Sequence, residues 1–245
     1  MDVSLLLGRL LRQLERSLPN RCLLCQQPLS QGQGLCDVCL SDHDPGDLCL
    51  GCTGPLPAPV PWRCGPCLAR KRWRPLVTAF PYHSPPGYLT GAIKIHGQLA
   101  LLPPLCDALA QRITDLWALG ALPRPDLLVP VPMHPSKLPQ RGFNHALLIA
   151  NALGQRLSLP VAPELVRKVR RTRDQHGLSG AERRRNLVGC FEVVPGAARA
   201  QLALVDDVVT TGATFAALAA SLRREGHGVS QYWALASAMS PARFS

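Results

Sequence analysis

Long apolar segments and aromatic residues are scarce in this chain of 245 residues, and basic residues outnumber acidic ones. No stretch approaches the roughly 20 apolar residues that a membrane-spanning helix requires, so we expect no such helix. Aromatic residues make up 5% of a chain that is 47% hydrophobic, so its apolar bulk is Leu, Ala and Val, as in helices packed on a sheet. The net charge of +11 indicates an anionic partner: nucleic acid, a phosphorylated small molecule or an acidic membrane surface.

The N-terminal residues also lack the layout of a secretory signal. The apolar run covers only residues 5–7, and its arginines follow it, whereas a signal peptide places positive charge before a longer apolar segment. The leucines of residues 1–19 instead recur at helical spacing, which predicts a short amphipathic helix. We therefore expect a cytoplasmic protein.

Cysteine, by contrast, is abundant and unevenly placed. Eight of the ten cysteines lie between residues 22 and 67, as four Cys-x-x-Cys pairs. Two residues between cysteines let a tight turn direct both thiolates at one ion, and two such pairs complete a tetrahedral site that suits Zn²⁺. Disulfides fit a cytosolic chain poorly, and the spacing is that of zinc ribbons rather than of iron–sulfur proteins. The expected ligands are Cys22, Cys25, Cys36, Cys39, Cys49, Cys52, Cys64 and Cys67.

The pairing of these cysteines stays open at the level of sequence. Sequential pairing gives the first four cysteines one ion and the last four another, and the halves look like repeats because each has a Pro-Leu between its pairs. An interleaved cross-brace would use the same eight residues. In either arrangement four thiolates fill the coordination shell, so we expect two structural zinc ions in a double zinc ribbon over residues 20–70.

A basic run with one tryptophan follows the last cysteine pair, at residues 70–74. Charge and stacking together would let such a run bind single-stranded nucleic acid. A solvated linker whose Trp73 is anchored in a domain interface is an equally weighted alternative.

Residues 75–240 alternate apolar strands with helical segments, which is typical of an α/β domain with a mostly parallel sheet. The pattern predicts strands at residues 127–131, 201–205 and 229–236, and helices at residues 144–159 and 214–224.

The most informative segment follows the strand at residues 201–205. It carries two adjacent carboxylates, Asp206 and Asp207, and then the hydroxyl-rich loop of residues 210–214 directly before a helix. Ligands of open α/β sheets bind at the carboxyl ends of the strands. Backbone amides, threonine hydroxyls and a helix N-terminus form a cradle for phosphate, while neighbouring acids suit the hydroxyls of a ribose. The segment therefore predicts a ribose-phosphate site.

The same segment resembles the 5-phosphoribosyl 1-pyrophosphate (PRPP) motif of type I phosphoribosyltransferases. From about residue 20 to residue 240 the chain is similar to the ComF family, which is associated with DNA uptake and competence. The resemblance rests on the cysteine pairs, on the PRPP motif, on VPVPMHPSK and RGFN in residues 129–144, and on QHGL, RRRN and Phe191 in residues 175–191. It implies a type I phosphoribosyltransferase-like domain over residues 75–240, preceded by the small Cys-rich module.

The resemblance also implies a role for each matching residue. Asp206 and Asp207 would hold the ribose hydroxyls, and the loop after residue 131 would be a pyrophosphate loop with Lys137 and Arg141 as its cations. The arginine-rich residues 167–186 would be a mobile loop that closes over PRPP and its Mg²⁺. The residues that would wrap the 5′-phosphate are Thr210, Thr211, Gly212, Ala213 and Thr214. In a transferase, Asp206, Asp207, Lys137 and Arg141 would be the catalytic residues.

The function that the resemblance implies is PRPP binding in DNA uptake or processing, with single-stranded DNA or another nucleic acid and proteins of an uptake machinery as partners. Two alternatives stay open: an active phosphoribosyltransferase that uses an unidentified small base, and a PRPP-sensing regulator without turnover. A glutamine amidotransferase is not expected, because such enzymes need a nucleophilic cysteine at the mature N-terminus and residue 2 here is Asp.

Overall fold

The computed structural model describes residues 21–29, 34–57, 62–70, 73–170 and 185–239, so the helix predicted over residues 1–19 lies outside the described part. The elements, in chain order, are α2 (Asp37–Asp42), α3 (Gly65–Leu68), β1 (Leu76–Pro81), α4 (Pro85–His96), η1 (Leu99–Leu101), α5 (Leu102–Ala118), β2 (Leu127–Pro130), η2 (Pro135–Lys137), α6 (Leu138–Arg141), α7 (His145–Leu157), η3 (Pro163–Leu165), β3 (Val166–Lys168), β4 (Phe191–Val193), β5 (Gln201–Val209), α9 (Ala213–Arg224) and β6 (Gly228–Ser237). Among these residues, no helix has both the length and the hydropathy that crossing a membrane requires.

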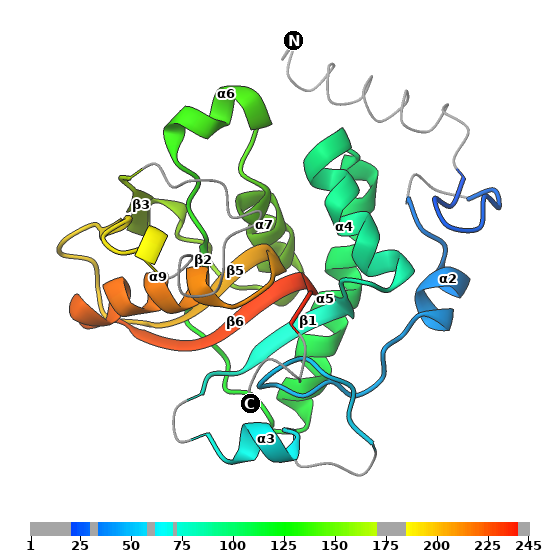
Figure 1. The fold of residues 1–245 in the computed structure, drawn as a ribbon, viewed down its shortest axis with the longest axis horizontal. Helices are drawn as coiled ribbons and strands as arrows, with labels where there is room; N and C mark the ends of the chain where they lie inside the picture. The colour runs from blue at the N-terminus through cyan, green and yellow to red at the C-terminus, as the bar shows by residue number, and fades with distance from the viewer. Residues whose placement is uncertain (1–20, 30–33, 58–61, 71–72, 171–184, 240–245) are drawn as a thin grey trace.

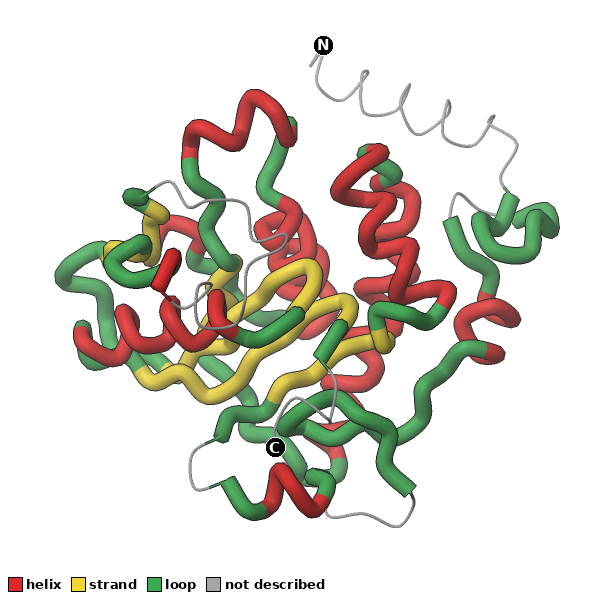
Figure 2. The backbone as a smooth tube through the Cα atoms, in the orientation of Figure 1, coloured by secondary structure: helices red, strands yellow, loops and turns green. Residues whose placement is uncertain are grey.

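A parallel sheet of four strands, in the order β1-β6-β5-β2, forms the centre of the molecule (Figure 2). All three strand pairs are parallel. Parallel neighbours need crossover connections, and here α7 lies between β2 and β5 in the chain, while α9 lies between β5 and β6. The prediction of an α/β domain with a mostly parallel sheet is confirmed.

Helices cover both faces of this sheet (Figure 1), which explains why its strands are apolar on both sides. Along β5, Ala203 and Val205 belong to the core that contains α5 and α7. The alternate residues Leu202 and Leu204 belong to the core that contains α9. Trp233 of β6 is fully buried and is the largest such side chain.

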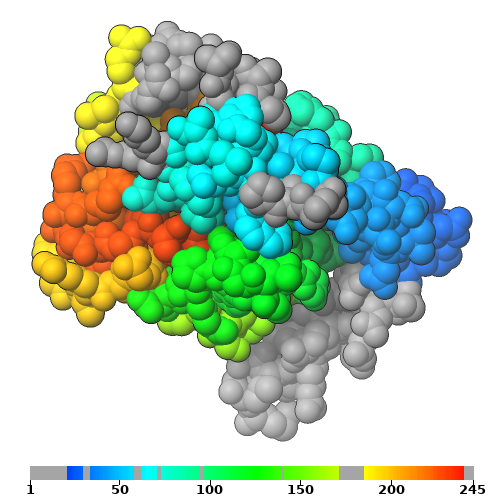
Figure 3. All heavy atoms as spheres, turned by 90° about the horizontal axis from the view of Figure 1, so that it is seen from below, coloured from blue at the N-terminus to red at the C-terminus, as the bar shows by residue number. Residues whose placement is uncertain are grey.

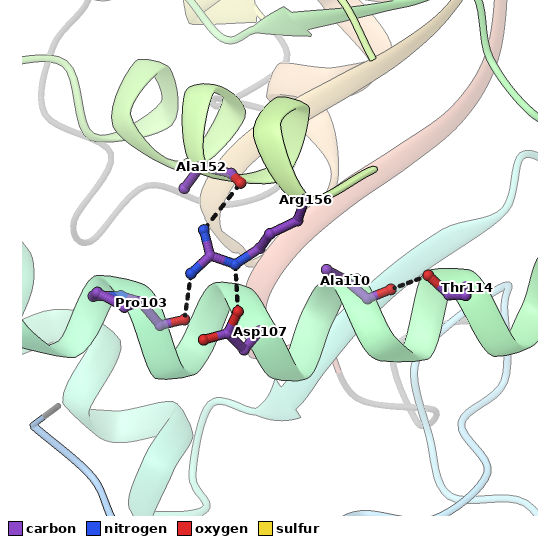
Figure 4. A network of polar contacts seen from close by, with 6 residues as sticks. All are labelled: Pro103, Asp107, Ala110, Thr114, Ala152 and Arg156. Atoms are coloured by element: carbon purple, nitrogen blue, oxygen red, sulfur yellow. Dashed lines mark hydrogen bonds and ion pairs between the residues drawn. The ribbon is translucent and has the colours of Figure 1, made fainter. Parts of the chain in front are cut away.

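An arginine joins the two long helices of the first face. Arg156 of α7 points at α5 and forms an ion pair with Asp107, and it donates through Nη2 to the Pro103 carbonyl at 3.4 Å (Figure 4). Its Nη1 donates to the Ala152 carbonyl of its own helix at 3.0 Å. Asp107 holds the pKa of Arg156 above its usual value, so the pair stays charged.

A two-stranded antiparallel sheet, β3 with β4, packs on the α9 side. Val166, Phe191 and Val193 are buried there in the same core as α9. This hairpin brings the ends of the arginine-rich segment back to the domain, since Lys168 is the last residue of β3 and pairs with Phe191.

Strand β5 is longer than predicted, and the extension contains the acidic pair. It continues to Val209 because β6 keeps pairing with it, through Asp206 with Ala234 and Val209 with Ser237. Strand β2 ends at Pro130, opposite Val205. The acidic pair therefore lies within β5, but beyond the end of its neighbour β2.

Candidate functional site

The eight paired cysteines form two groups of four. Their Sγ atoms lie within 4.8 Å of one another in each group, and the grouping is sequential rather than interleaved. We call Cys22, Cys25, Cys36 and Cys39 the first cysteine group, and Cys49, Cys52, Cys64 and Cys67 the second cysteine group. Zinc bound tetrahedrally by sulfur at about 2.3 Å separates its ligand atoms by about 3.8 Å. The Sγ–Sγ distances of Cys25 to Cys36 (3.7 Å), Cys49 to Cys64 (3.6 Å) and Cys52 to Cys64 (3.7 Å) match that geometry, so each group could hold zinc.

Backbone amides point at several of these sulfurs. The N–H of Cys36 donates to Cys22 Sγ at 3.5 Å, and the N–H groups of Gly51 and Cys64 donate to Cys49 Sγ at 3.3 and 3.2 Å. Burial raises the pKa of the Cys22 and Cys49 thiols, but surrounding N–H groups outweigh it and bring the pKa to about 6 and about 7. Because the thiolate is the form that binds metal, the backbone favours that form at one cysteine of each group. Burial, with neighbouring cysteines, raises the pKa of the Cys39, Cys52 and Cys67 thiols.

The first cysteine group lies at the margin of the molecule. The segment that carries it, residues 21–29 and 34–43, is drawn in blue at the right of Figure 3. It contacts the domain near α5, where Gly34 donates to the Ala100 carbonyl at 3.0 Å and the fully buried Leu35 packs in the same core as Leu101.

The second cysteine group is built into the sheet domain. Leu76, the first residue of β1, donates to the Leu50 carbonyl at 2.7 Å. Thr53, only 5% exposed, donates through Oγ1 to the hydroxyl of Ser237 at the end of β6, at 2.6 Å. In Figure 3 its cyan atoms border directly on the orange and red atoms of α9 and β6. The segment of the second cysteine group therefore contacts both the beginning of β1 and the end of β6, its neighbour in the sheet.

The acidic pair is fixed by its own backbone. Asp206 and Asp207 are half-buried. The Asp207 N–H donates to Asp206 Oδ1 at 2.9 Å, and the Val208 N–H donates to Asp207 Oδ1 at 2.8 Å. On the β2 side the ladder ends with the Val131 N–H bonded to the Val205 carbonyl at 2.8 Å. The carboxylates thus stand where one neighbouring strand has ended, which is the position at which open α/β sheets bind ligands.

The loop after β5 leads directly into α9. Gly212 is the N-cap residue of α9 and has a left-handed backbone conformation (φ +69°). A Cβ atom there would meet nothing within 4 Å, so glycine is required for its backbone conformation and the space above it is open. Thr210 is exposed, Thr211 and Thr214 are half-buried, and Ala213, the first helical residue, is buried. A helix N-terminus with this open approach is suited to an anion.

The loop between β2 and α7 carries the expected pyrophosphate cations. Asn144 closes its base, since its side chain donates to the Val131 carbonyl at 3.1 Å and accepts from the Ala146 N–H at 3.1 Å. Lys137 ends η2 and Arg141 ends α6, on the two short helices that form the top of this loop in Figure 1.

Lys168 is a third cation at this edge. Burial lowers its pKa, the nearby Lys137 lowers it further, and the Asp206 carboxylate raises it, so both lie within electrostatic reach of Lys168. Its ammonium lies 5.8 Å from the centre of the Phe191 ring, which fixes the side chain beside the hairpin. The sequence placed Lys168 in a mobile loop; its position in β3 follows from pairing with β4, a contact between segments far apart in the chain.

The remaining basic segments are partly described. Of residues 167–186, those from 171 to 184 lie outside the described part of the chain, and Arg170 donates to the Val188 carbonyl at 2.8 Å. In the run at residues 70–74, Trp73 is half-buried against the core, and the Arg63 guanidinium lies 4.2 Å from its ring centre. Trp73 is therefore an anchor in a domain interface, which is the second of the two readings of this run.

Comparison with known proteins gives a consistent set of relatives. No protein-family model matches the chain. It is 33% identical over 225 residues to the DNA utilization protein YhgH of Escherichia coli (strain K12), and 30% identical over 223 residues to competence protein F of Haemophilus influenzae. Each alignment covers 89% of this chain and 97% of the relative. Among solved structures, adenine phosphoribosyltransferase from Leishmania donovani is similar with a TM-score of 0.36 and 13% identity, covering 62% of this chain and 71% of that one.

Proposed function

Since the chain belongs to the ComF family, we propose that it binds PRPP at the carboxyl edge of its sheet and serves the uptake or use of DNA. The observation that carries this proposal is the acidic pair of β5 beside an open, glycine-capped helix N-terminus. Ribose hydroxyls donate hydrogen bonds to carboxylates, and a phosphate accepts them from backbone N–H groups. The acidic pair supplies the carboxylates, and the loop of residues 210–214 with the start of α9 supplies the N–H groups, which supports a ribose 5-phosphate as the ligand.

The residues of the edge divide the ligand between them. Asp206 and Asp207 accept hydrogen bonds from the 2′- and 3′-hydroxyls, and residues 210–214 surround the 5′-phosphate. Lys137 and Arg141 offset the charge of the pyrophosphate, and Lys168 joins them because Asp206 and Lys137 both lie within its electrostatic reach. Magnesium bound with PRPP would neutralise pyrophosphate charge, and the carboxylates and hydroxyls of this edge are oxygen ligands of the kind Mg²⁺ prefers.

Two structural zinc ions complete the proposal. Each cysteine group presents four sulfurs to one ion, which fills the coordination shell and leaves no position for a substrate. Zinc therefore shapes the protein without taking part in the chemistry of the PRPP site.

Replacing Asp206 and Asp207 together by Asn is expected to weaken binding of Mg²⁺–PRPP at least about 100-fold, because two charge-assisted hydrogen-bonding groups are lost. Calorimetric titration of the zinc-loaded protein measures this directly. The matched control is Asp126→Asn, since Asp126 accepts from the Gln201 N–H at 2.7 Å at the opposite end of the same strand and should leave PRPP affinity unchanged. Absence of PRPP binding in the unaltered protein would refute the proposal, and pyrophosphate release with an added base would establish turnover.

The nucleic-acid part of the proposal has its own test. Exchanging Arg170, Arg171 and Arg173 for Gln is expected to reduce the salt dependence of single-stranded DNA binding by about 2 in the log–log slope, since each phosphate contact contributes about 0.7. Fluorescence anisotropy with a labelled oligothymidylate at several salt concentrations gives the slope.

The control for this experiment removes the same charge elsewhere. Exchanging Arg199, Arg223 and Arg224 for Gln changes the net charge equally, at the end of α9 remote from the PRPP loop. If both triple variants lose affinity equally, binding follows overall charge and the arginine-rich segment has no special part in it.

A further inference from the structure

The two cysteine groups begin with the same backbone turn. In each, the N–H of the residue after the first cysteine pair donates to the carbonyl of the first cysteine, at 2.9 Å for Gln26 and at 2.7 Å for Thr53. These two residues share a left-handed backbone conformation, with φ +61° and +59°. Each directly follows the second cysteine of its pair, so Cys25 and Cys52 occupy equivalent positions in the two turns.

The two equivalent cysteines differ in exposure. Cys25 is exposed, whereas Cys52 is 1% exposed. The second turn is covered because Thr53 donates to the Ser237 hydroxyl at the end of β6. The first turn lies at the margin of the molecule, in the segment drawn in blue in Figure 3. The same ligand position is therefore open to solvent in one group and closed in the other.

Within the first cysteine group, the four sulfurs divide into an inner and an outer pair. The inner pair is Cys22 and Cys39, which are 0% and 7% exposed. The outer pair is the exposed Cys25 and the half-buried Cys36, whose Sγ atoms are 3.7 Å apart. A disulfide bond is about 2.05 Å long, so a movement of less than about 2 Å would join the outer pair. The outer pair is thus both accessible to a small solute and poised to react with itself.

The second cysteine group shields its sulfurs more completely. A Cβ atom at Gly51 would lie 2.7 Å from Cys67 Sγ, so the Gly51 backbone covers that sulfur directly. Cys64 is half-buried, but the sulfurs at 3.6 and 3.7 Å from it belong to Cys49 and Cys52, each 1% exposed. A solute that reaches Cys64 therefore finds the neighbouring sulfurs buried.

We propose that the first cysteine group is an oxidation site for hydrogen peroxide, with Cys25 as the attacking thiolate and Cys36 as the resolving thiolate. Attack of the Cys25 thiolate on one peroxide oxygen forms a sulfenic acid and releases hydroxide. The Cys36 thiolate then displaces a second hydroxide from that sulfur and forms the disulfide. The two thiolates lose two electrons, and the peroxide is reduced to two hydroxide ions. With two of its four ligands joined, the first cysteine group releases Zn²⁺, while the second cysteine group keeps its ion.

The proposal rests on the proposed function only in that zinc is the ion bound by both groups. Free thiolates give the same disulfide as zinc-bound thiolates, so the product of oxidation identifies the reacting cysteines with or without metal. The first cysteine group is tied to the domain at Gly34 and Leu35, near α5. Oxidation is therefore expected to act on the margin of the molecule and not on the strand that carries the acidic pair.

The test treats the full-length zinc-loaded protein with hydrogen peroxide, follows released zinc with a chromogenic chelator and identifies the product by peptide mass spectrometry. One zinc per chain is expected to leave at least about tenfold faster than the other, because oxidation follows the exposure of the thiolate. The expected product is a disulfide between Cys25 and Cys36, and dithiothreitol with added Zn²⁺ should restore two ions. In Cys36→Ser, the sulfenic acid at Cys25 should persist and be trapped by dimedone.

A variant of the second cysteine group tests the cause of the difference. Ser237→Ala removes the contact that covers the second turn, so the slow zinc should leave at least about threefold faster while the fast zinc is unchanged. Alkylation by N-ethylmaleimide gives the order of reaction without an oxidant, and Cys25 must react before Cys52.

Equal rates of zinc release from the two groups, or a first disulfide that lacks Cys25, would overturn the proposal. Metal analysis keeps this result apart from the proposed function. Fewer than two zinc ions per chain in the unaltered protein would refute the zinc part of that function, while the disulfide formed by peroxide would still decide which cysteines react.

Discussion

Replacing both Cys64 and Cys67 by serine is expected to lower the melting temperature by roughly 10–20 °C and to leave one zinc per chain instead of two. Structural zinc contributes on the order of 10–16 kcal/mol in isolated zinc-binding peptides, which is comparable with the whole stability of a domain. The second cysteine group would therefore unfold locally without its ion. Its unfolding would release the bonds of Leu50 to Leu76 and of Thr53 to Ser237, which tie it to β1 and β6.

The matched variant replaces Cys22 and Cys25 by serine. It also loses one zinc, but the first cysteine group contacts the domain near α5 rather than the strands of the sheet. We expect it to lower the melting temperature by less than half as much. At roughly 2–4 °C per kcal/mol for a chain of this size, calorimetric scans resolve the difference, and metal analysis gives the stoichiometry. Equal destabilisation by the two double variants would show that the second group is no more integrated into the sheet than the first.

An alanine at Gly87 is expected to destabilise the protein by about 3 kcal/mol, whereas an alanine at Gly91, one turn later in α4, should stabilise it by up to about 1 kcal/mol. A Cβ at Gly87 would lie 2.8 Å from the Pro81 carbonyl carbon and closer still to its oxygen, so the backbone between β1 and α4 must move. That movement also disturbs Ser84, which donates to the Pro81 carbonyl at 2.7 Å and caps α4 through the Gly87 N–H at 3.3 Å. Overpacking and a damaged cap together account for the expected loss.

Gly91 differs from Gly87 in its surroundings rather than in its secondary structure. A Cβ there would first meet the Tyr82 hydroxyl at 3.5 Å, an ordinary contact, so the lower conformational entropy of alanine in the unfolded chain decides the sign. Urea denaturation of both single variants gives the two free energies of unfolding. A loss at both positions would mean that the helix cannot accept any side chain on this face.

Much of the fold follows from local pattern. The apolar run at residues 127–131 and the periodicity of residues 144–159 and 214–224 predicted β2, α7 and α9 to within two residues at each end. The end of β5 did not follow from pattern, because acidic residues are poor strand formers, and it is the continued pairing with β6, from Asp206 with Ala234 to Val209 with Ser237, that extends the strand through them. The pairing of β5 with β6 there outweighs the low strand propensity of the two aspartates.

The candidate site divides in the same way. Its acidic pair and the threonine-rich loop of residues 210–214 are contiguous in the sequence, so a motif was enough to point to them. The sequence left the cysteine pairing open, and the structure groups the cysteines sequentially. The place of Lys168 in β3 and the bond from Arg74 to β6 could not be predicted, because both arise between segments that meet only in the folded chain. Arg74, for example, reaches the Val229 carbonyl across 155 positions of sequence.

The order of strands in the sheet also governs how the chain assembles while it is being synthesised. Strand β1 is complete at residue 81, but its neighbour in the described sheet is β6, which ends at residue 237. A ribosome adding roughly 5–20 residues per second needs on the order of ten seconds to make the chain between them. During that interval β1 and the cysteine module lack the strand β6 against which they later pack. Exposed apolar strand edges favour aggregation, so we expect chaperones to assist folding at this stage. The cysteine groups can form early in synthesis, whereas the sheet that carries the acidic pair closes only after its last strand leaves the ribosome.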